Sequence, residues 1–193
     1  MNICIYGASG KRLDARYFEA ARSLGGAIGR RGHALVFGGG AHGLMGACAE
    51  GAAGAGAEIL GIAPRFFDEP GLLFPGCTRF VWTDTLSERK AAMEDAAEAF
   101  IVLPGGIGTL EEFFETLTLK QLGLHGKPIA LLNTLGYFDA LRTLLEQAAE
   151  GGFMSRNCLR LCAFCATPEE ALSYVETAEP LTGGLRRLED YTR

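Results

Sequence analysis

Residues 104–112 read PGGIGTLEE and directly follow the apolar run AFIVL at 99–103. A short run of large apolar residues rich in branched side chains is typical of a strand that is buried on both faces. After the glycines, apolar residues recur at helical spacing, at Leu110, Phe113 and Leu117. The stretch therefore predicts a glycine-rich turn between a buried strand and the N-terminus of a helix.

This turn has the features of an anion site. Gly105, Gly106 and Gly108 carry no side chains that would hold a ligand's oxygens away from the backbone. The first amide groups of a helix lack intrahelical acceptors and lie at the positive end of the helix dipole. We therefore expect a phosphate here. Two carboxylates, Glu111 and Glu112, follow within one turn, and because a pure phosphate site would not favour them, they indicate chemistry.

Glu112 also has a purely structural interpretation. Thr109 and Glu112 fit a capping box, in which Thr109 is the N-cap and Glu112 reaches back to its amide. Glu111 and Glu112 point about 100° apart on a helix, so only Glu112 shares the face of Thr109. From the residues alone, both interpretations of Glu112, helix cap and catalyst, stay open.

Outward from this stretch, apolar strand-like runs alternate with helical patterns. The alternation predicts an α/β fold: one domain over residues 1–177, with an open, mostly parallel sheet of about seven strands and helices on both faces. From 178 to 193 the chain is more polar, and we expect a C-terminal tail. Strands are expected at 2–6, 34–37, 58–62, 79–82, 99–103, 128–132 and 159–165, and helices at 14–31, 43–56, 86–98, 109–122, 136–150 and 168–177.

Glycine-rich turns follow three of the expected strands, at 7–10, 38–40 and 105–106. Because the carboxyl ends of parallel strands share one edge, the three turns can surround one phosphorylated ligand. The alternative for residues 38–40 is a tight turn with close packing of the small-residue helix that follows. The chain contains neither G-x-G-x-x-G after the first strand nor a G-x-x-x-x-G-K-[ST] loop, so a standard dinucleotide or phosphate-loop site is not expected.

Between 62 and 79 the chain contains a proline-rich segment with five large apolar side chains. We expect it to be a loop that either covers a pocket or packs against a partner subunit. The apolar residues are Phe66, Phe67, Leu72, Leu73 and Phe74.

Two cations follow Ser87, which we expect to be the N-cap of a helix that ends near Glu98. Arg89 and Lys90 at that position oppose the helix dipole, and residues that break a local rule are candidates for function. The arginine offers a planar fork for a phosphate or carboxylate, and the lysine offers a point charge. The alternative for Lys90 is a solvated helix face, paired with Glu88 and Glu94.

Composition narrows the function classes. The formal net charge is −5 and no long basic run is present, which argues against nucleic acid or a membrane surface as a partner. The sequence shows neither a signal-peptide pattern nor an apolar run of about 20 residues, so we expect a cytoplasmic protein.

A cluster of three cysteines could be interpreted as a metal site, at Cys158, Cys162 and Cys165. It lacks a fourth ligand nearby, and the strand-like alternation puts the last two cysteines on opposite faces. No metal site is expected.

Taken together, three motifs resemble the LOG family of cytokinin riboside 5′-monophosphate phosphoribohydrolases, which are often labelled lysine decarboxylase-like. They are GGG-x-x-GLMG at 38–46, ERK-x-x-M at 88–93 and PGG-x-GT-x-x-E at 104–112, and the likeness continues to about residue 177. The resemblance implies a Rossmann-like fold, a homodimer and no cofactor. It also implies hydrolysis of the N-glycosidic bond of an adenine-type nucleoside 5′-monophosphate, which gives the free base and ribose 5-phosphate.

By motif position, Arg89 and Glu112 match the family's catalytic pair. A carboxylate under the sugar can stabilise an oxocarbenium-like state, orient a water or attack directly, whereas an arginine stays protonated and acts electrostatically. The expected substrate-binding residues are Ser9, Gly39, Gly40, Arg89, Lys90, Gly105, Gly106, Ile107, Gly108, Thr109, Leu110, Glu111 and Thr118.

The sequence departs from the family pattern at two places near the expected ligand. Ala8 replaces a serine, and Leu86-Ser87 replaces a Met-His pair. These departures leave both N6-prenylated and plain adenine open as the base. A non-catalytic nucleotide- or cofactor-binding carrier or sensor of the same fold is the alternative function. A pyridoxal phosphate enzyme would need a Schiff-base lysine with its supporting acid, and neither Lys90 nor Lys127 has such a setting.

Overall fold

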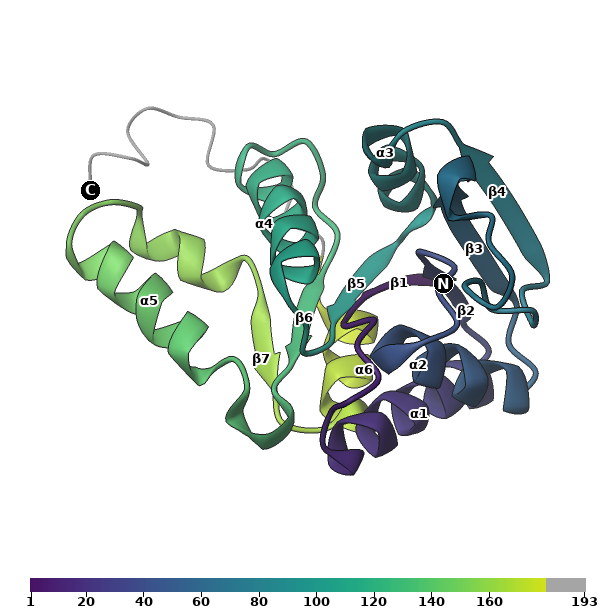
Figure 1. Cartoon of the computed structure of the whole chain (residues 1–193). Helices are drawn as coiled ribbons and strands as arrows, with labels where there is room; N and C mark the ends of the chain where they lie inside the picture. Colours follow the sequence, from purple (N-terminus) through teal and green to yellow (C-terminus); the bar gives the residue numbers. More distant parts are fainter. Residues whose placement is uncertain (180–193) are drawn as a thin grey trace.

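A computed structural model describes residues 1–179, in which seven strands form one parallel sheet (Figure 1). Their order across the sheet is β4-β3-β2-β1-β5-β6-β7. The chain begins in the middle, adds three strands outward on one side, and then returns to place β5 against the free side of β1. The strands are β1 (Asn2–Tyr6), β2 (Ala34–Phe37), β3 (Ile59–Pro64), β4 (Arg79–Thr83), β5 (Ala99–Val102), β6 (Ile129–Leu132) and β7 (Ala163–Cys165).

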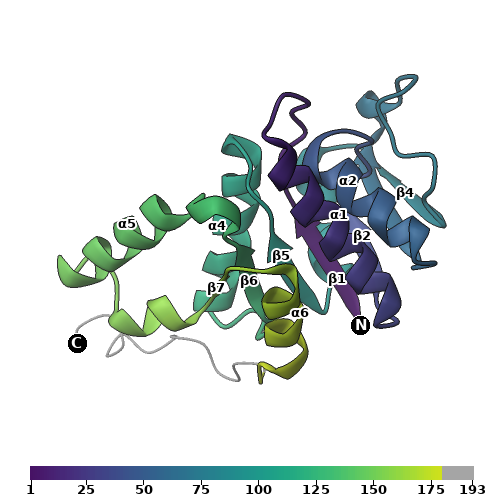
Figure 2. The same ribbon diagram turned by 90° about the horizontal axis from the view of Figure 1, so that it is seen from below.

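Helices cover both faces of this sheet, as predicted. Three of them, α1 (Ala15–Arg30), α2 (Gly43–Gly54) and α6 (Pro168–Thr177), pack on one face, which is turned towards the viewer in Figure 2. The other face is covered by α3 (Leu86–Ala96), α4 (Ile107–Gln121) and α5 (Asp139–Glu150). Short 3-10 helices also occur, η1 (Arg65–Phe67), η2 (Thr134–Gly136) and η3 (Arg156–Arg160).

The central strand shows why the strands have near-continuous apolar sequences. Along β1, Ile3 and Ile5 point into the core beneath α1, α2 and α6, whereas Cys4 and Tyr6 point into the core beneath α3 and α4. All four side chains are buried. A strand with a core on each side needs apolar residues at every position rather than at alternate ones.

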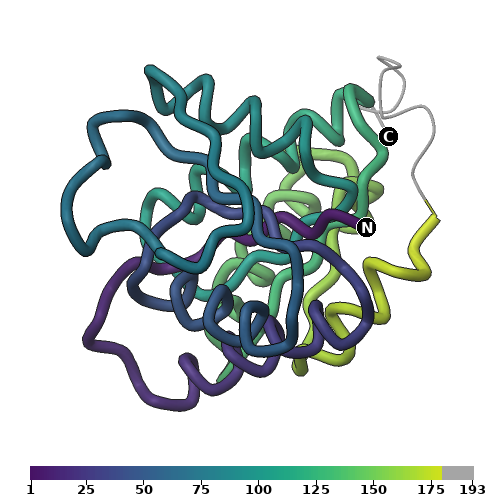
Figure 3. The backbone as a smooth tube through the Cα atoms, turned by 90° about the vertical axis from the view of Figure 1, so that its right-hand side faces the viewer, coloured from purple at the N-terminus to yellow at the C-terminus, as the bar shows by residue number. Residues whose placement is uncertain are grey.

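The register brings the ends of the central strands to one level. Ile5 is paired with Phe37 of β2, and Tyr6 is paired with Val102 of β5. The turns that follow these strands therefore begin side by side at the carboxyl edge of the sheet, where the strand order changes direction and where α/β proteins bind ligands. In Figure 3 the segments after β1 and β3 project on the same side of the molecule.

Close contact between α1 and α2 explains the small residues at 43–57. A Cβ atom on Gly25 would lie 1.9 Å from the carbonyl oxygen of Cys48, and one on Gly51 would lie 2.1 Å from the carbonyl oxygen of Arg22. Both glycines are needed because the two backbones touch. The small-residue run thus packs against a helix, α1, as well as against the sheet.

The predicted strand at 159–165 is wrong over its first half. Residues 156–160 form η3, and β7 begins only at Ala163. The side chain of Ser155 accepts a hydrogen bond from the amide of Asn157 and starts the 3-10 helix. Cys158 and Leu161, three residues apart, both enter the core on the α4 side. Helical spacing of buried residues therefore prevails over the apparent alternation.

The helix expected from 136 begins at Asp139, because residues 134–136 form η2. No helix within residues 1–179 is long and apolar enough to cross a membrane. Of the predicted C-terminal tail, residues 180–193 lie outside the described residues, so the domain boundary at 177 stays a prediction.

Candidate active site

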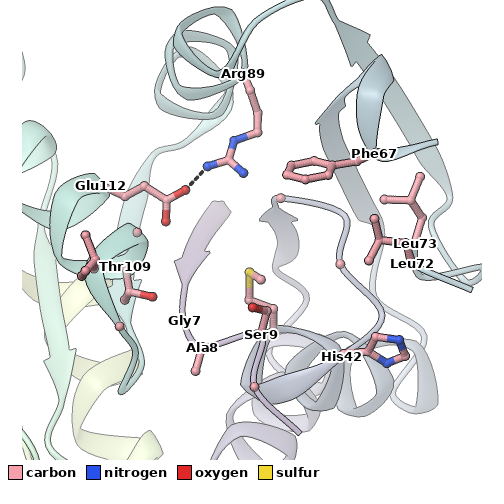
Figure 4. A pocket seen from close by; sticks show the side chains of 17 residues that line it. Gly7, Ala8, Ser9, His42, Phe67, Leu72, Leu73, Arg89, Thr109 and Glu112 are labelled. Atoms are coloured by element: carbon pink, nitrogen blue, oxygen red, sulfur yellow. Dashed lines mark hydrogen bonds and ion pairs between the residues drawn. The ribbon is translucent and has the colours of Figure 1, made fainter. Parts of the chain in front are cut away.

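A cavity of about 690 Å³ opens at the carboxyl edge of the sheet, between the turns that follow β1, β2 and β5 (Figure 4). Its position follows from the topology, because these three strands are neighbours and end at one level. It is lined by Gly7, Ala8, Ser9, Gly10, Gly38, Gly40, His42, Met45, Phe67, Leu72, Leu73, Arg89, Gly106, Ile107, Gly108, Thr109 and Glu112.

Backbone hydrogen bonds hold the three glycine turns together. The amide of Ala8 donates to the carbonyl of Pro104 at 3.0 Å, and the amide of Leu44 donates to the carbonyl of Ala8 at 2.8 Å. Gly43 lies against the same loop, since a Cβ atom there would be 2.2 Å from the Ala8 carbonyl oxygen. The structure thus brings together the turns that the sequence predicts to share one ligand.

The expected capping box at Thr109 is wrong. Helix α4 begins at Ile107 with Gly106 as its N-cap, and no side chain caps it. Thr109 lies in the first turn, is buried, and packs beneath the loop so closely that a Cβ atom on Gly105 would be 2.1 Å from its Oγ1. No side chain caps the N-terminus of α4, and its first residues line the cavity, so the uncapped amides of the first turn are available to an anion there.

Glu112 and Arg89 form an ion pair inside the cavity, across the gap between α4 and α3 (Figure 4). The guanidinium donates a hydrogen bond to Oε1 of the carboxylate. The side chain of Glu112 is only 11% exposed, and that of Arg89 is only 15% exposed. Glu112 therefore does not cap the helix and pairs with Arg89 instead, and its catalytic role stays a prediction.

The surroundings of this pair change its chemistry. Burial raises the pKa of the Glu112 carboxyl from 4.5 to about 7, and the Arg89 guanidinium opposes the shift without cancelling it. The Nε atom of Arg89 is buried and has no hydrogen-bond partner among the described residues. A buried donor without an acceptor is costly, and residues that break such a local rule are candidates for function.

The cap of α3 also differs from the prediction. Its N-cap is Thr85, whose side chain accepts from the amide of Glu88 at 3.1 Å, and Ser87 lies inside the helix. Lys90 pairs neither with Glu88 nor with Glu94. Its ammonium group donates to Glu111 of α4 and lies 2.7 Å from Glu115. The cations of α3 are thus accommodated by carboxylates of α4, which an isolated helix pattern does not reveal.

The expected binding residues fall into two groups in the structure. Ser9, Gly40, Arg89 and residues 106–109 line the cavity, as does Glu112. Thr118 lies on an exposed part of α4 and donates to the carbonyl of Phe114 at 2.7 Å. The predicted positions that do not line the cavity are Gly39, Lys90, Gly105, Leu110, Glu111 and Thr118.

One wall of the cavity comes from the proline-rich segment after β3. Leu73 forms an antiparallel bridge with Gly40, and the amide of Phe74 donates to the carbonyl of Gly39 at 2.8 Å. Phe67, Leu72 and Leu73 therefore line the cavity, on the side opposite Glu112 in Figure 4. The segment was expected either to cover a pocket or to pack against a partner subunit, and these three residues cover a pocket.

His42 and Met45 line the cavity as well, and the sequence analysis did not single them out. Both lie within the GGG-x-x-GLMG motif, so their position in that motif could have indicated them as residues of the site. Among residues 1–179, no group of three His, Cys, Asp or Glu side chains is arranged to hold a metal ion.

Comparisons with known proteins show which proteins the chain is similar to. A family model described as "Possible lysine decarboxylase" matches residues 45–175. The chain is 36% identical over 177 residues to the probable cytokinin riboside 5′-monophosphate phosphoribohydrolase LOGL3 of Oryza sativa subsp. japonica, with 92% of this chain and 84% of that protein covered. It is 35% identical over 178 residues to the cytokinin riboside 5′-monophosphate phosphoribohydrolase LOG2 of Arabidopsis thaliana, again with 92% and 84% covered.

Among solved structures, the molybdenum cofactor carrier protein of Chlamydomonas reinhardtii superposes with a TM-score of 0.70 at 22% identity. The match covers 91% of this chain and 95% of that one. At this level of identity the likeness concerns the fold alone.

Proposed function

Because the chain belongs to the LOG family of cytokinin riboside 5′-monophosphate phosphoribohydrolases, we propose that it hydrolyses the N-glycosidic bond of adenine-type nucleoside 5′-monophosphates. The products are the free base and ribose 5-phosphate. The observation that carries the proposal is the buried Arg89–Glu112 pair, which lines the same cavity as the uncapped N-terminus of α4.

The phosphate end of the substrate fits the N-terminus of α4. The backbone there is open at Gly106 and Gly108, where an added Cβ atom would meet nothing within 4 Å. Free amides and the positive end of the helix dipole bind a phosphate without any basic side chain. Once the phosphate is anchored, its binding energy holds the ribose in place near Glu112, five residues further along the same helix.

Glu112 is the group that meets the developing positive charge. Cleavage of a ribosyl–base bond passes through an oxocarbenium-like state, which a nearby carboxylate stabilises. Burial strengthens this interaction because the cavity has a lower dielectric constant than water. The same burial raises the pKa of the carboxyl to about 7, so Glu112 gains or loses a proton near neutral pH, as a group that activates a water molecule does.

Arg89 acts electrostatically, since its guanidinium stays protonated. One nitrogen of the fork holds Glu112 in position. The other terminal nitrogen, Nη1, lies beside Gly38, which lines the cavity, and is the donor available to the substrate. A planar fork can make both contacts at once, which a lysine ammonium at the same place would not do in the same geometry.

Decarboxylation of lysine, which the family model's description suggests, has no support in the cavity. A pyridoxal phosphate enzyme requires a lysine that forms a Schiff base within the site. No lysine lines the cavity of the described chain. Lys90 is held by Glu111 and Glu115, and Lys127 donates to the carbonyl of Glu94. The proposed hydrolysis needs water and no cofactor.

The experiment that tests the proposal is a base-release assay with the purified protein. AMP, isopentenyladenosine monophosphate, GMP and CMP are offered in turn, and adenosine serves as the unphosphorylated control. We expect release from the adenine nucleotides, with adenosine at least about a hundredfold slower because it lacks the charge-assisted phosphate contacts. Tight binding of these nucleotides without any base release would favour the non-catalytic carrier instead.

We further propose that the protein is a homodimer and that α5 contributes to the interface. Along α5, Leu141, Leu144, Leu145 and Ala148 form an apolar stripe at helical spacing. Leu144 is 58% exposed, and Phe153 beyond the helix is 88% exposed. Exposed apolar side chains of this size are typical of a surface that a partner covers.

The proposed compartment is the cytoplasm. All six cysteines are free thiols, and five of them are buried. Disulfides are rare in the reducing cytosol, where buried cysteines act as small apolar residues.

A further inference from the structure

Tyr137 lies outside the cavity but contacts the loop that forms its phosphate end. The residue follows η2, and its hydroxyl donates a hydrogen bond of 2.6 Å to the backbone carbonyl of Gly105. Neither Tyr137 nor Gly105 lines the cavity, whereas Gly106 does. Any influence of Tyr137 on a ligand therefore passes through the peptide group between the two glycines.

The surroundings of Tyr137 hold its ring in place. Its edge meets the ring of Tyr17 in α1, with the centroids 6.2 Å apart. Next to it, the amide of Phe138 donates to the side chain of Asn133 at 2.6 Å, and that side chain donates to Asp139 at 2.7 Å. The segment also contains Leu135 with a φ of 56°, a conformation that is strained for a non-glycine residue and persists only where its surroundings enforce it.

The hydrogen bond selects the orientation of the Gly105–Gly106 peptide group. In a trans peptide the C=O and N–H bonds point in opposite directions. When the Gly105 carbonyl points to Tyr137, the Gly106 amide points the other way, towards the cavity that Gly106 lines. Glycines rotate more freely than other residues, so this backbone does not select that orientation without a partner for the carbonyl.

The neighbouring carbonyl is held in the same manner. The amide of Ala8 donates to Pro104 at 3.0 Å, so two successive carbonyls of the loop have partners outside the loop. Thr109 fills the space beneath Gly105, which keeps the loop from moving inward. Only the amide side of the Gly105–Gly106 peptide remains open to a ligand.

We propose that Tyr137 is a positioning residue that holds the Gly106 amide towards the cavity, so that it donates to the substrate's phosphate. The inference deepens the proposed function and rests on it for the identity of the anion as a nucleotide phosphate. Tyr137 touches neither the sugar nor the base. Its loss should therefore weaken phosphate binding while the bond-breaking step stays nearly unchanged.

The test compares Tyr137→Phe with the wild type and with Tyr174→Phe. The phenylalanine keeps the ring that packs on Tyr17 and removes only the hydroxyl. Tyr174 lies in α6, which packs on the face of the sheet opposite α4, so its variant controls for the loss of a tyrosine hydroxyl. Calorimetric titrations with inorganic phosphate and with ribose 5-phosphate measure binding, and base release from AMP and adenosine measures turnover.

We expect the Kd for both phosphate probes to rise about three- to tenfold in Tyr137→Phe, as the loss of one hydrogen bond implies. The KM for AMP should rise by a similar factor, while kcat and the slow reaction of adenosine change less than about twofold. In the wild type, addition of phosphate should shift the amide NMR signal of Gly106. Tyr174→Phe should match the wild type throughout.

Several results would overturn the inference. One is phosphate binding by Tyr137→Phe that equals that of the wild type. Another is an equal loss of activity on AMP and adenosine, which would indicate a general structural role. A Gly106 signal that phosphate leaves unmoved would also contradict it. Failure of the proposed function is a separate outcome: a wild type that binds phosphate but releases no base from any nucleotide refutes the hydrolase, and the titrations still decide the role of Tyr137.

Discussion

Glu112 is the residue on which the proposed chemistry depends, and its pKa is the property that can be measured directly. Burial raises this pKa from 4.5 to about 7, so the carboxyl is largely neutral at pH 5 and largely charged at pH 8. The proposed mechanism requires the charged form. We therefore expect kcat/KM to rise as the pH increases through about 7. This rise lies at a higher pH than the ionisation of the substrate's phosphate, which occurs near pH 6.

The measurement is a carbon NMR titration of glutamate-labelled protein, with Glu112→Gln used to assign the signal. A midpoint of the Glu112 titration near pH 4.5 would contradict the expectation.

The raised pKa of Glu112 also has a consequence for stability, because the folded state binds the proton more tightly than the unfolded chain. The stability that the neutral carboxyl contributes is complete below about pH 4.5 and is lost as the pH rises through about 7. Between pH 5 and 8 the wild type should therefore lose more stability than Glu112→Gln.

The second prediction at this site concerns the charge itself. Glu112→Gln keeps the size of the side chain but offers no negative charge to an oxocarbenium ion. Loss of such an interaction costs roughly 3 kcal/mol in the transition state, so we expect kcat for AMP to fall about a hundredfold or more. Because Glu112 caps no helix, the variant should fold normally.

The matched control is Glu115→Gln, one turn further along α4, where the carboxylate pairs with Lys90 outside the cavity. Its kcat should stay within about threefold of the wild type. Base release and a melting curve are recorded for both variants. Normal turnover by Glu112→Gln would remove Glu112 from the mechanism, whatever its effect on stability.

Helices α1 and α2 support the glycine turns from below, and their contact depends on the absence of side chains. A Cβ atom on Gly25 would lie 1.9 Å from the Cys48 carbonyl oxygen, which belongs to a backbone that has no room to move aside. Gly25→Ala should therefore force the two helices apart and lower the free energy of unfolding by about 1–3 kcal/mol or more.

Gly54→Ala is the control for this prediction. Gly54 also lies in α2, but a Cβ atom there would meet nothing within 4 Å. Alanine restricts the unfolded chain and favours the helix, so this variant should be neutral or more stable by up to about 1 kcal/mol. Denaturant unfolding of both variants gives the comparison. Similar stabilities for Gly25→Ala and Gly54→Ala would show that α1 and α2 do not pack this closely in solution.

The molecule as a whole exposes apolar side chains on α5 and beyond it, which the proposed homodimer would cover. Light scattering should give a mass of about twice 20.6 kDa at micromolar protein. Leu144→Glu places a charge in the proposed interface, where burial without a partner is costly, and should shift the mass towards the monomer.

Leu86→Glu serves as the control for the dimer. Leu86 is 47% exposed at the first position of α3, where a carboxylate is favoured by the helix dipole, and this variant should keep the wild-type mass. A wild type that remains monomeric at these concentrations would refute the proposal, and a dimer unaffected by Leu144→Glu would move the interface away from α5.

The sequence of neighbouring residues determined the class of the fold and the position of the cavity at the glycine turns. Alternating apolar runs and helical patterns predicted the parallel sheet with helices on both faces. The glycine-rich turns at 7–10, 38–40 and 105–106 predicted the edge of the sheet at which the cavity lies. These features depend on neighbouring residues, so they can be read along the chain. The motif resemblance added Arg89 and Glu112 as a pair.

Only the tertiary structure decided which groups meet across the site. Arg89 and Glu112 are 23 residues apart and belong to different helices, so their ion pair and the raised pKa of Glu112 exist only once α3 and α4 pack on the same face. The same packing pairs Lys90 with Glu111 and Glu115 of α4 rather than with the acidic residues of its own helix. Thr109 does not have its expected capping role because α4 begins two residues earlier, with Gly106 as its N-cap. Its side chain packs against Gly105 instead. Contacts between distant segments depend on how elements pack, and no local pattern carries that information.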